Sequence, residues 1–322
     1  MAHPLVAVLL TCHNRRARTL ACLDALFRQS ATRIRKEVFV IDSSSTDGTS
    51  EAIRDCFPKV NVFQAGSDIY WNAGMRMAFA YAHDCGPDYY LWLNDDVLLD
   101  KDGLARLLDA NRDLQSRRSP PAIVVGSTRD PKTGELTYGG VIRPDWRRRM
   151  HYELVNPRNT MRQVETMNGN CVLIPSSVAA RVGNLASVYR HGMGDFDYGH
   201  RAVRSGCEVW LVSGTVGTCA RNQPGQPART LRELLQLENS PIGGLPRSEW
   251  FTYARRWAGP FWFVFAVSPY ARRVSRWVLQ RGIGHVNESL PRVLRFLGGF
   301  RPSILPGCFG SAGGVEAGGD IE

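Results

Sequence analysis

Hydrophobic and polar positions in the first hundred residues alternate between short aliphatic runs and longer amphipathic stretches. Leu5–Leu10 is continuously aliphatic, which is typical of a strand buried on both faces of a parallel sheet. Residues 15–29 repeat apolar positions at helical spacing, and Asn14 is placed to cap that helix. Further strands are predicted at 37–41, 60–64 and 89–93, and helices at 49–56 and 71–83. This alternation predicts a doubly wound α/β sheet that binds its ligands at the carboxyl ends of the strands.

The second half of the chain is less regular. Strands are predicted at 123–126, 136–142, 169–174 and 208–212, a loop at 143–150, and a helix at 196–205 with Phe196, Ala202 and Val203 packed inward. The α/β rhythm stops near Gly217, and residues 229–237 form an amphipathic stretch. We therefore expect a first domain over 1–220, a helical, aromatic and basic extension over 221–297, and a glycine-rich disordered tail over 298–322.

Composition narrows the choice of partners and compartment. Lys and Arg total 40 of the 322 residues and Asp and Glu total 30, a balance of +10 that favours nucleotide phosphates, nucleic acid or an acidic membrane face. The eight cysteines form no CxxC pair, which indicates buried thiols in a reducing compartment. The N-terminus lacks a basic region and a cleavage site, and the apolar stretch 257–270 is shorter than the roughly 20 residues of a spanning helix. We expect a cytoplasmic protein without a membrane span.

Two adjacent carboxylates follow the predicted strand at 89–93. Asp95 and Asp96 repel each other at a buried strand end unless a cation lies beside them, and hard oxygen ligands suit Mg²⁺ or Mn²⁺. The alternative is a solvated turn that caps the next helix. Both interpretations are open on these residues alone.

A second group of polar residues follows the first two strands. Asp42 can accept a hydrogen bond from a nucleobase or a ribose hydroxyl, and His13 can stack on a base. Thr11 and Asn14 lie at the same predicted edge. The alternative for Asp42 is an N-cap of the next helix.

A third group lies in residues 191–202, where Asp195 opens a predicted helix. A helix N-terminus and a nearby cation both favour an ionised carboxylate, which a general base requires. Simple N-capping is the alternative, and capping and catalysis can coexist.

The order and spacing of these groups resemble glycosyltransferase family 2, the inverting GT-A type, over residues 4–220. Residues 6–15 resemble the opening strand and nucleoside loop, and 40–49 resemble the motif V-D-N-x-S-x-D-G-T. Residues 94–96 occupy the position of the DxD metal motif, and 194–197 that of E-D-x-D. Four stretches resemble the rhamnosyltransferase-like branch of the family: 70–75, 93–97, 167–174 and 239–250.

The resemblance implies a GT-A nucleotide-diphospho-sugar transferase fold, a Rossmann-like mixed sheet flanked by helices, with a C-terminal helical extension. It implies metal-dependent, inverting transfer of a sugar, rhamnose in that branch, from a nucleotide-diphosphate donor to a saccharide or lipid-linked acceptor in cell-surface polysaccharide synthesis. The implied roles are nucleoside binding by Thr11, His13, Asn14 and Asp42, donor binding by Gly74, Arg76, Asn94 and Asp95, metal binding by Asp96 with Asp95 (Mg²⁺ or Mn²⁺), and base catalysis by Asp195.

The chain departs from the family pattern at three places. Asn94 replaces the first DxD carboxylate, and Gly194 replaces the glutamate before the base. Cys219 and Arg221 stand near the position where many members supply a histidine, so the last metal ligand is open. These departures also make a catalytically degenerate nucleotide-sugar-binding protein an alternative.

Other functional classes fit less well. A nucleotidyltransferase needs a glycine-rich basic loop after the first strand, and a dehydrogenase needs GxGxxG there; residues 11–14 are neither. The basic residues are too dispersed for a nucleic-acid binder. The aromatic and arginine-rich segment 250–281 suits peripheral contact with the inner face of the cell membrane, or packing on the sheet or on a second subunit of a homo-oligomer.

Overall fold

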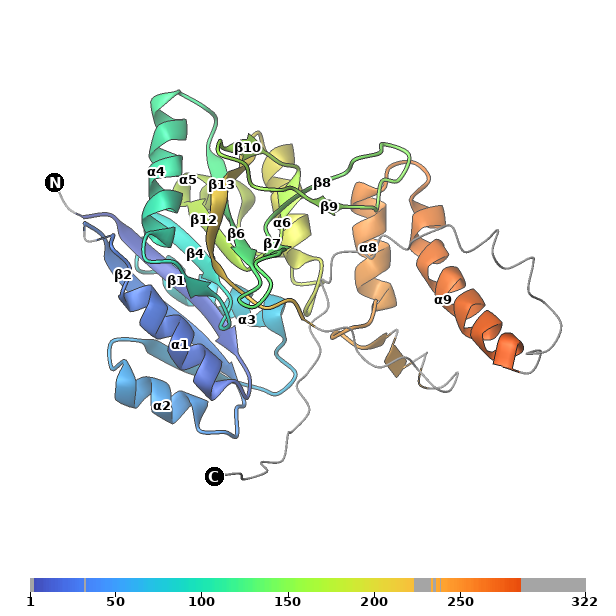
Figure 1. Cartoon of the computed structure of the whole chain (residues 1–322), viewed down its shortest axis with the longest axis horizontal. Helices are drawn as coiled ribbons and strands as arrows, with labels where there is room; N and C mark the ends of the chain where they lie inside the picture. Colours follow the sequence, from blue (N-terminus) through green and yellow to red (C-terminus); the bar gives the residue numbers. More distant parts are fainter. Residues whose placement is uncertain (1–2, 32, 223–232, 234–235, 238, 285–322) are drawn as a thin grey trace.

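The computed structural model describes residues 3–31, 33–222, 233, 236–237 and 239–284, and its centre is one mixed sheet (Figure 1). The strands run in the order β10-β13-β6-β12-β4-β1-β2-β3, with β5 paired to β13 and β7 to β6. Their bounds are β1 Leu5–Cys12, β2 Arg35–Ser43, β3 Asn61–Ala65, β4 Tyr89–Leu93, β5 Leu98–Leu99, β6 Ala122–Arg129, β7 Leu136–Tyr138, β10 Arg162–Gln163, β12 Cys171–Pro175 and β13 Glu208–Thr218. Strands β1 to β4 pair in parallel, whereas β12 is antiparallel to both β4 and β6. The predicted mixed sheet is confirmed.

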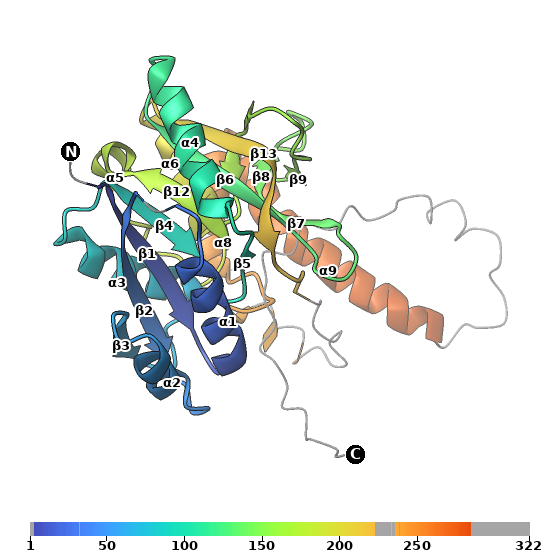
Figure 2. The ribbon, with the colours of Figure 1, turned by 60° about the vertical axis from the view of Figure 1, so that its left-hand side comes forward.

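Helices cover both faces of this sheet, and Figure 2 shows α1 and α4 on the same face. Helices α1 (Arg16–Phe27), α2 (Thr49–Cys56) and α4 (Gly103–Ser116) share one hydrophobic core, and α3 (Trp71–His83), α5 (Ser176–Val182) and α6 (Gly194–Arg204) share the other. In β1, Val8 enters the first core and its neighbour Leu9 enters the second. Side chains alternate across a strand, so burial on both faces accounts for the uninterrupted aliphatic run.

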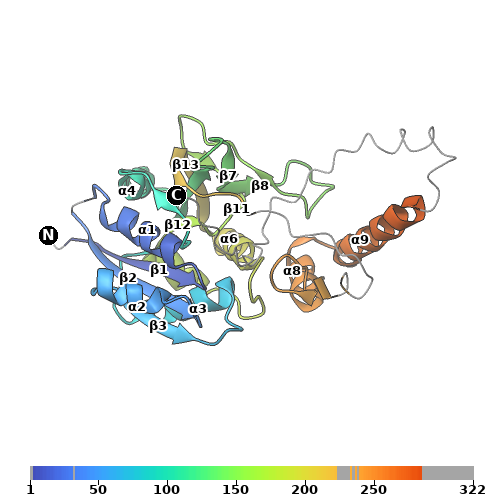
Figure 3. The ribbon, with the colours of Figure 1, turned by 60° about the horizontal axis from the view of Figure 1, so that its bottom comes forward.

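A third core lies beyond α6. It joins the small sheet of β8 (Gly140–Ile142), β9 (Glu153–Leu154) and β11 (Thr166–Met167) to α8 (Arg247–Trp257) and the start of α9 (Trp262–Gly284). Phe196 of α6 and Trp250 and Tyr253 of α8 are buried in it. In Figures 1 to 3, α9 extends away from the main sheet. No described helix combines the length and the hydropathy that crossing a membrane requires.

Most predicted elements are present, with several differences. The helices at 103–116 and 176–182 were not predicted, although Leu104, Leu107 and Leu108 carry helical spacing. The predicted strand at 136–142 is two strands in different sheets, separated at Gly139. Val203 is 47% exposed rather than packed inward.

Asn14 does not cap α1, because the residue that flanks the helix is Arg15 and no side chain caps it. Asn14 instead has a left-handed backbone (φ 50°), and its Oδ1 accepts a hydrogen bond from Thr46 N at 2.8 Å. The amphipathic stretch 229–237 lies largely, and the tail at 298–322 entirely, outside the described residues. The predicted domain limits stay a prediction.

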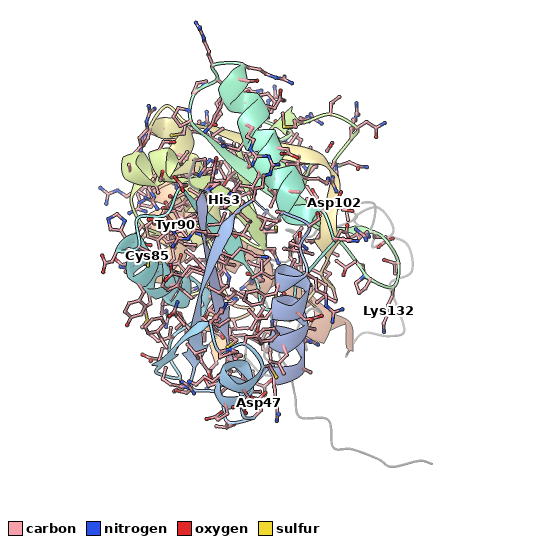
Figure 4. The ribbon with its side chains drawn as sticks, turned by 90° about the vertical axis from the view of Figure 1, so that its left-hand side faces the viewer. His3, Asp47, Cys85, Tyr90, Asp102 and Lys132 are labelled. Atoms are coloured by element: carbon pink, nitrogen blue, oxygen red, sulfur yellow. The ribbon has the colours of Figure 1, made fainter. Side chains whose placement is uncertain are left out.

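The two ends of the sheet are marked in Figure 4 by His3, which precedes β1, and by Asp47, in the turn after β2. The carboxyl ends of β1 and β2 therefore lie at the Asp47 end. Asp47 Oδ2 accepts a hydrogen bond from Arg16 N at 3.0 Å, which ties this turn to the start of α1. The candidate site lies at this edge.

Candidate active site

The paired carboxylates after β4 are held by an arginine that flanks the start of α1. Arg15 Nη1 lies 3.0 Å from Asp95 Oδ1 and 3.1 Å from Asp96 Oδ2. Asp95 is only 4% exposed, and its pKa is raised to about 6 by burial, with the charge of Asp96 adding to the rise and Arg15 opposing it. Two adjacent carboxylates repel each other when both are ionised, unless a cation lies beside them. In the described residues the guanidinium of Arg15 supplies it.

Trp71 connects this acidic turn to the start of α6. Its Nε1 donates a hydrogen bond to Asn94 Oδ1 at 2.7 Å, and its ring packs against Gly169. Gly169 N in turn donates to Asp195 Oδ2 at 2.9 Å. The backbone makes the same connection, because Asn94 N donates to Asn170 O at 2.9 Å. Carboxylates from β4 and α6 are thus brought to one edge of the sheet.

Asp195 is the second residue of α6, directly after Gly194, and lies in the first turn of the helix. The N-cap is Met193, so Asp195 is not the cap residue. Burial raises the pKa of Asp195 to about 6, and the N–H groups of Gly169 and Phe196 oppose that rise. At neutral pH the carboxylate is ionised and more basic than an exposed aspartate, which suits a general base.

Asp42 lies beneath the surface of this edge. It is fully buried, its Oδ1 accepts from Ser45 N at 2.9 Å, and its Oδ2 accepts from the Ser50 hydroxyl and from Gln64 Nε2 at 3.4 Å. Both carboxylate oxygens are therefore engaged with the turn after β2, α2 and β3. The N-cap of α2 is Gly48, so Asp42 is not the cap that sequence left as an alternative.

His13 and Asn14 are the exposed polar residues at the end of β1. His13 Nδ1 lies 2.6 Å from Ser43 O, and its Nε2 lies 3.2 Å from Asn14 Nδ2. A carbonyl only accepts, so Nδ1 carries the hydrogen and Nε2 accepts from Asn14. This arrangement fixes the imidazole face at the rim of the sheet.

Gly74 and Arg76 are engaged within the protein. A Cβ at Gly74 would lie 2.5 Å from Thr11 Oγ1, so glycine permits close packing of α3 on the end of β1. Arg76 Nε donates to Leu185 O at 2.9 Å, which holds the segment that precedes α6. Their predicted contacts with a donor stay predictions.

The departure at Gly194 has a structural reason. A side chain there would overlap the amide oxygen of Asn72, which is buried. The amide nitrogen of Asn72 donates a hydrogen bond to Tyr189 O at 2.6 Å. The amide of Asn72 thus occupies the space into which the family's glutamate would project. Sequence reasoning could not find this pair, which is separated by more than one hundred residues.

The residues at the acidic turn fit a divalent cation that also binds substrate. Cys219 Sγ lies 3.4 Å from Asp96 Oδ1, but no three His, Cys, Asp or Glu residues of the described part of the chain form a metal-binding group. Mg²⁺ commonly uses one or two carboxylates and completes its shell with water and substrate phosphates. Asp95 and Asp96 match that pattern.

Sequence reasoning assigned no role to His191, which lies just before α6. Burial and the charge of Arg15 lower its pKa to about 4, so the imidazole is neutral at pH 7. Its ring lies 6.3 Å from that of Tyr70, and its Nδ1 has no hydrogen-bond partner among the described residues. This nitrogen is therefore a buried polar atom that the described residues leave without a partner.

The mixed sheet flanked by helices is that of the GT-A fold, and the paired carboxylates after β4 and the buried carboxylate of α6 lie at one edge of it. Residues 7–183 match the family model described as Glycosyl transferase family 2, which is more than half of the chain. The chain belongs to this family and is a glycosyltransferase, as its sequence motifs predicted.

A curated relative supports the branch within the family. The chain is 28% identical over 232 residues to the N-acetylglucosaminyl-diphospho-decaprenol L-rhamnosyltransferase of Mycobacterium tuberculosis, which covers 65% of this chain and 71% of that protein. The predicted resemblance to the rhamnosyltransferase-like branch is confirmed.

Solved structures support the fold. The structures of S. aureus TarS 1-349 in complex with UDP and with UDP-GlcNAc have TM-scores of 0.51 and 0.52 at 13% identity. Each covers 77% of this chain, and the chain spans 65% of each of them. The predicted GT-A fold is confirmed.

Proposed function

We propose that this glycosyltransferase moves a sugar from a nucleotide diphosphate to a hydroxyl of a lipid-linked saccharide, with inversion and with a divalent metal, during cell-surface polysaccharide synthesis. The main support is the buried carboxylate of Asp195, which accepts a hydrogen bond from Gly169 N at 2.9 Å. Trp71 packs against Gly169 and donates to Asn94, which connects Asp195 to the turn that bears Asp95 and Asp96. Rhamnose and a lipid-diphosphate acceptor are the favoured substrates because the name of the mycobacterial relative contains both.

Asp195 carries the proton transfer in this proposal. Its carboxylate takes the proton of the acceptor hydroxyl while the acceptor oxygen attacks the anomeric carbon of the donor. The bond from that carbon to the diphosphate oxygen breaks, and the nucleotide diphosphate leaves on the opposite side. A single displacement of this kind inverts the anomeric configuration. The raised pKa of Asp195 supports the role because it makes the carboxylate a stronger base.

Asp95 and Asp96 would hold the metal, with Asp96 the more exposed of the two carboxylates (14% against 6%). A bound Mg²⁺ or Mn²⁺ would neutralise charge on the leaving diphosphate. Arg15 contacts the same carboxylates, so its guanidinium would also be close enough to bind a diphosphate oxygen of the donor. Asn94 Oδ1 accepts a hydrogen bond from Trp71, and a side chain at Gly194 would overlap Asn72, so both departures have a structural role in this fold.

Thermal unfolding with a panel of nucleotide-diphosphate sugars tests the function. With Mn²⁺ or Mg²⁺ present, the accepted donor at one hundred times its Kd should add about 2.7 kcal/mol to the free energy of unfolding, and the free sugar should add nothing. The stabilising donor is then offered to an N-acetylglucosaminyl-diphospho-lipid, and the anomeric configuration of the product is read by NMR. If donors stabilise the protein but are neither transferred nor hydrolysed, the chain is a binding protein. Retained configuration would refute the single displacement.

We further propose that the transfer takes place at the inner face of the cell membrane and that α9 contacts the bilayer. Phe263, Val267 and Val274 are 54%, 53% and 38% exposed, and their spacing puts them on one stripe of the helix. Arg272 and Arg276 are exposed on another side, and residues 250–284 contain no Asp or Glu. An apolar stripe beside arginines suits the interface of an anionic bilayer.

Liposome flotation tests the membrane proposal. The full chain should float with vesicles that contain phosphatidylglycerol, and the double variant Phe263→Glu/Val267→Glu should stay at the bottom of the gradient because it places charge in the apolar stripe. Val203→Glu is the matched control, since Val203 is also exposed but lies on α6. Equal flotation of wild type and the double variant would exclude α9 as the contact, and a dimer lost only in the double variant would favour a second subunit as its partner.

A further inference from the structure

The buried carboxylate of Asp197 joins the catalytic helix to the C-terminal helices. Asp197 is fully buried and accepts hydrogen bonds from two residues of α8, Arg256 Nη1 at 2.9 Å and Trp257 Nε1 at 3.0 Å. It also accepts from Arg201 Nε at 2.8 Å within α6 and from the Tyr189 hydroxyl at 3.3 Å. A buried charge with four donors depends on all of them for its compensation.

Asp195 and Asp197 point in different directions from one helical turn. Side chains two positions apart on a helix point about 200° away from each other. When Asp195 faces Gly169, Asp197 therefore faces away from it. Asp195 Oδ2 accepts from Gly169 on the sheet side, and Asp197 accepts from α8 on the other. The first turn of α6 is therefore held from both sides.

A second ion pair connects α8 to the segment before α6. Glu249 of α8 is buried, and it accepts from Arg190 Nε at 2.8 Å and from Arg190 N at 3.2 Å. Arg190 O accepts from Ala73 N at 3.2 Å, at the start of α3. The segment that leads into Asp195 is thus held between α3 and α8.

We propose that α8 is a positioning element of the active site: through Asp197 and Glu249 it sets the place of Asp195, although none of its residues touches the reacting atoms. Trp71 and Ala73 of α3 contact Gly169 and Arg190, so α8, α3 and the acidic turn form one connected set around the base. The domain limit predicted near residue 220 then divides two segments, the first domain and the helical extension, that act together. The effect on turnover rests on the proposed transferase function, whereas the effect on local structure does not.

Three variants test the proposal, with one matched control. Asp197→Asn removes the charge, Trp257→Phe removes a single N–H donor, and Glu249→Gln weakens the hold on Arg190. Arg204→Gln is the control, because Arg204 also joins α6 to α8, over the Trp257 ring at 5.4 Å, but lies at the far end of α6 from Asp195. Asp197→Asn should lower kcat by about 10- to 100-fold, since small displacements of a catalytic group have effects of that size. Donor affinity should stay nearly unchanged, and Arg204→Gln should keep the wild-type kcat.

Amide hydrogen exchange of residues 190–198 gives a second readout that needs no turnover. Exchange should rise in Asp197→Asn, Trp257→Phe and Glu249→Gln and stay at the wild-type level in Arg204→Gln. If Asp197→Asn does not fold, Trp257→Phe and Glu249→Gln decide the question. Equal exchange in these variants and in the control would overturn the proposal, as would an equal loss of kcat in all four. An inactive wild type with the predicted exchange pattern would refute the transferase function and leave the positioning role standing.

Discussion

Replacing Asp195 with asparagine is expected to lower kcat by about 10²- to 10⁴-fold, the usual contribution of a general base. Donor affinity should stay nearly unchanged, because the amide oxygen of asparagine can still accept from Gly169 N, which lies 2.9 Å from the carboxylate. Steady-state kinetics and calorimetric titration with the donor measure the two effects separately. Asp109→Asn, an exposed aspartate of α4, is the matched control and should behave as wild type.

The pH dependence gives a check on the buried carboxylates of the site, because burial raises the pKa of both Asp195 and Asp95 to about 6. The base must be ionised, so kcat of the wild type should fall as the pH drops through about 6, the pKa of Asp195. That pKa lies above the ordinary 3.8, so the folded state binds the proton of Asp195 more tightly than the unfolded state does. The free energy of unfolding therefore falls as the pH rises from about 4 to 6 and Asp195 ionises. Asp195→Asn should therefore melt no lower than wild type at pH 8. Wild-type turnover in the variant would show that another group is the base.

Replacing Asp96 with alanine is expected to weaken metal-dependent donor binding by at least about 30-fold, since removal of one partner of a desolvated charge pair costs about 2–5 kcal/mol. Asp96 is the more exposed carboxylate of the pair and so the more accessible to an arriving cation. Calorimetric titration with the donor, with Mn²⁺ and after chelation, measures the change. In wild type, chelation should produce a similar loss.

Arg15→Gln distinguishes a metal effect from a charge effect at this turn. Without Arg15 the two carboxylates lose their only observed ion-pair partner among the described residues, so the free variant should be less stable at neutral pH than wild type. Mn²⁺ should restore more stability to this variant than it adds to wild type. If chelation changes donor affinity in neither wild type nor Arg15→Gln, the transfer is independent of metal and Arg15 is the permanent counter-ion.

Local patterns predicted much of the fold because they report local physics. The run Leu5–Leu10 is aliphatic since β1 is buried on both faces, and helix 71–83 has the bounds that its spacing predicted. Helix α4 had the same kind of apolar spacing and could have been predicted. The antiparallel place of β12 between β4 and β6 could not, because pairing partners depend on the path of the whole chain.

The residue types of the acidic turn, of the nucleoside loop and of the start of α6 identified the family, since each lies next to a strand or helix end that short-range sequence already marks. The contacts that surround them came from folding. Arg15 meets Asp95 across 80 residues, Asn72 meets Tyr189 across 117, and Asp197 meets Trp257 across 60. Such contacts arise when burial brings distant polar groups together and leaves each needing a partner in place of water, a requirement that no stretch of sequence expresses alone.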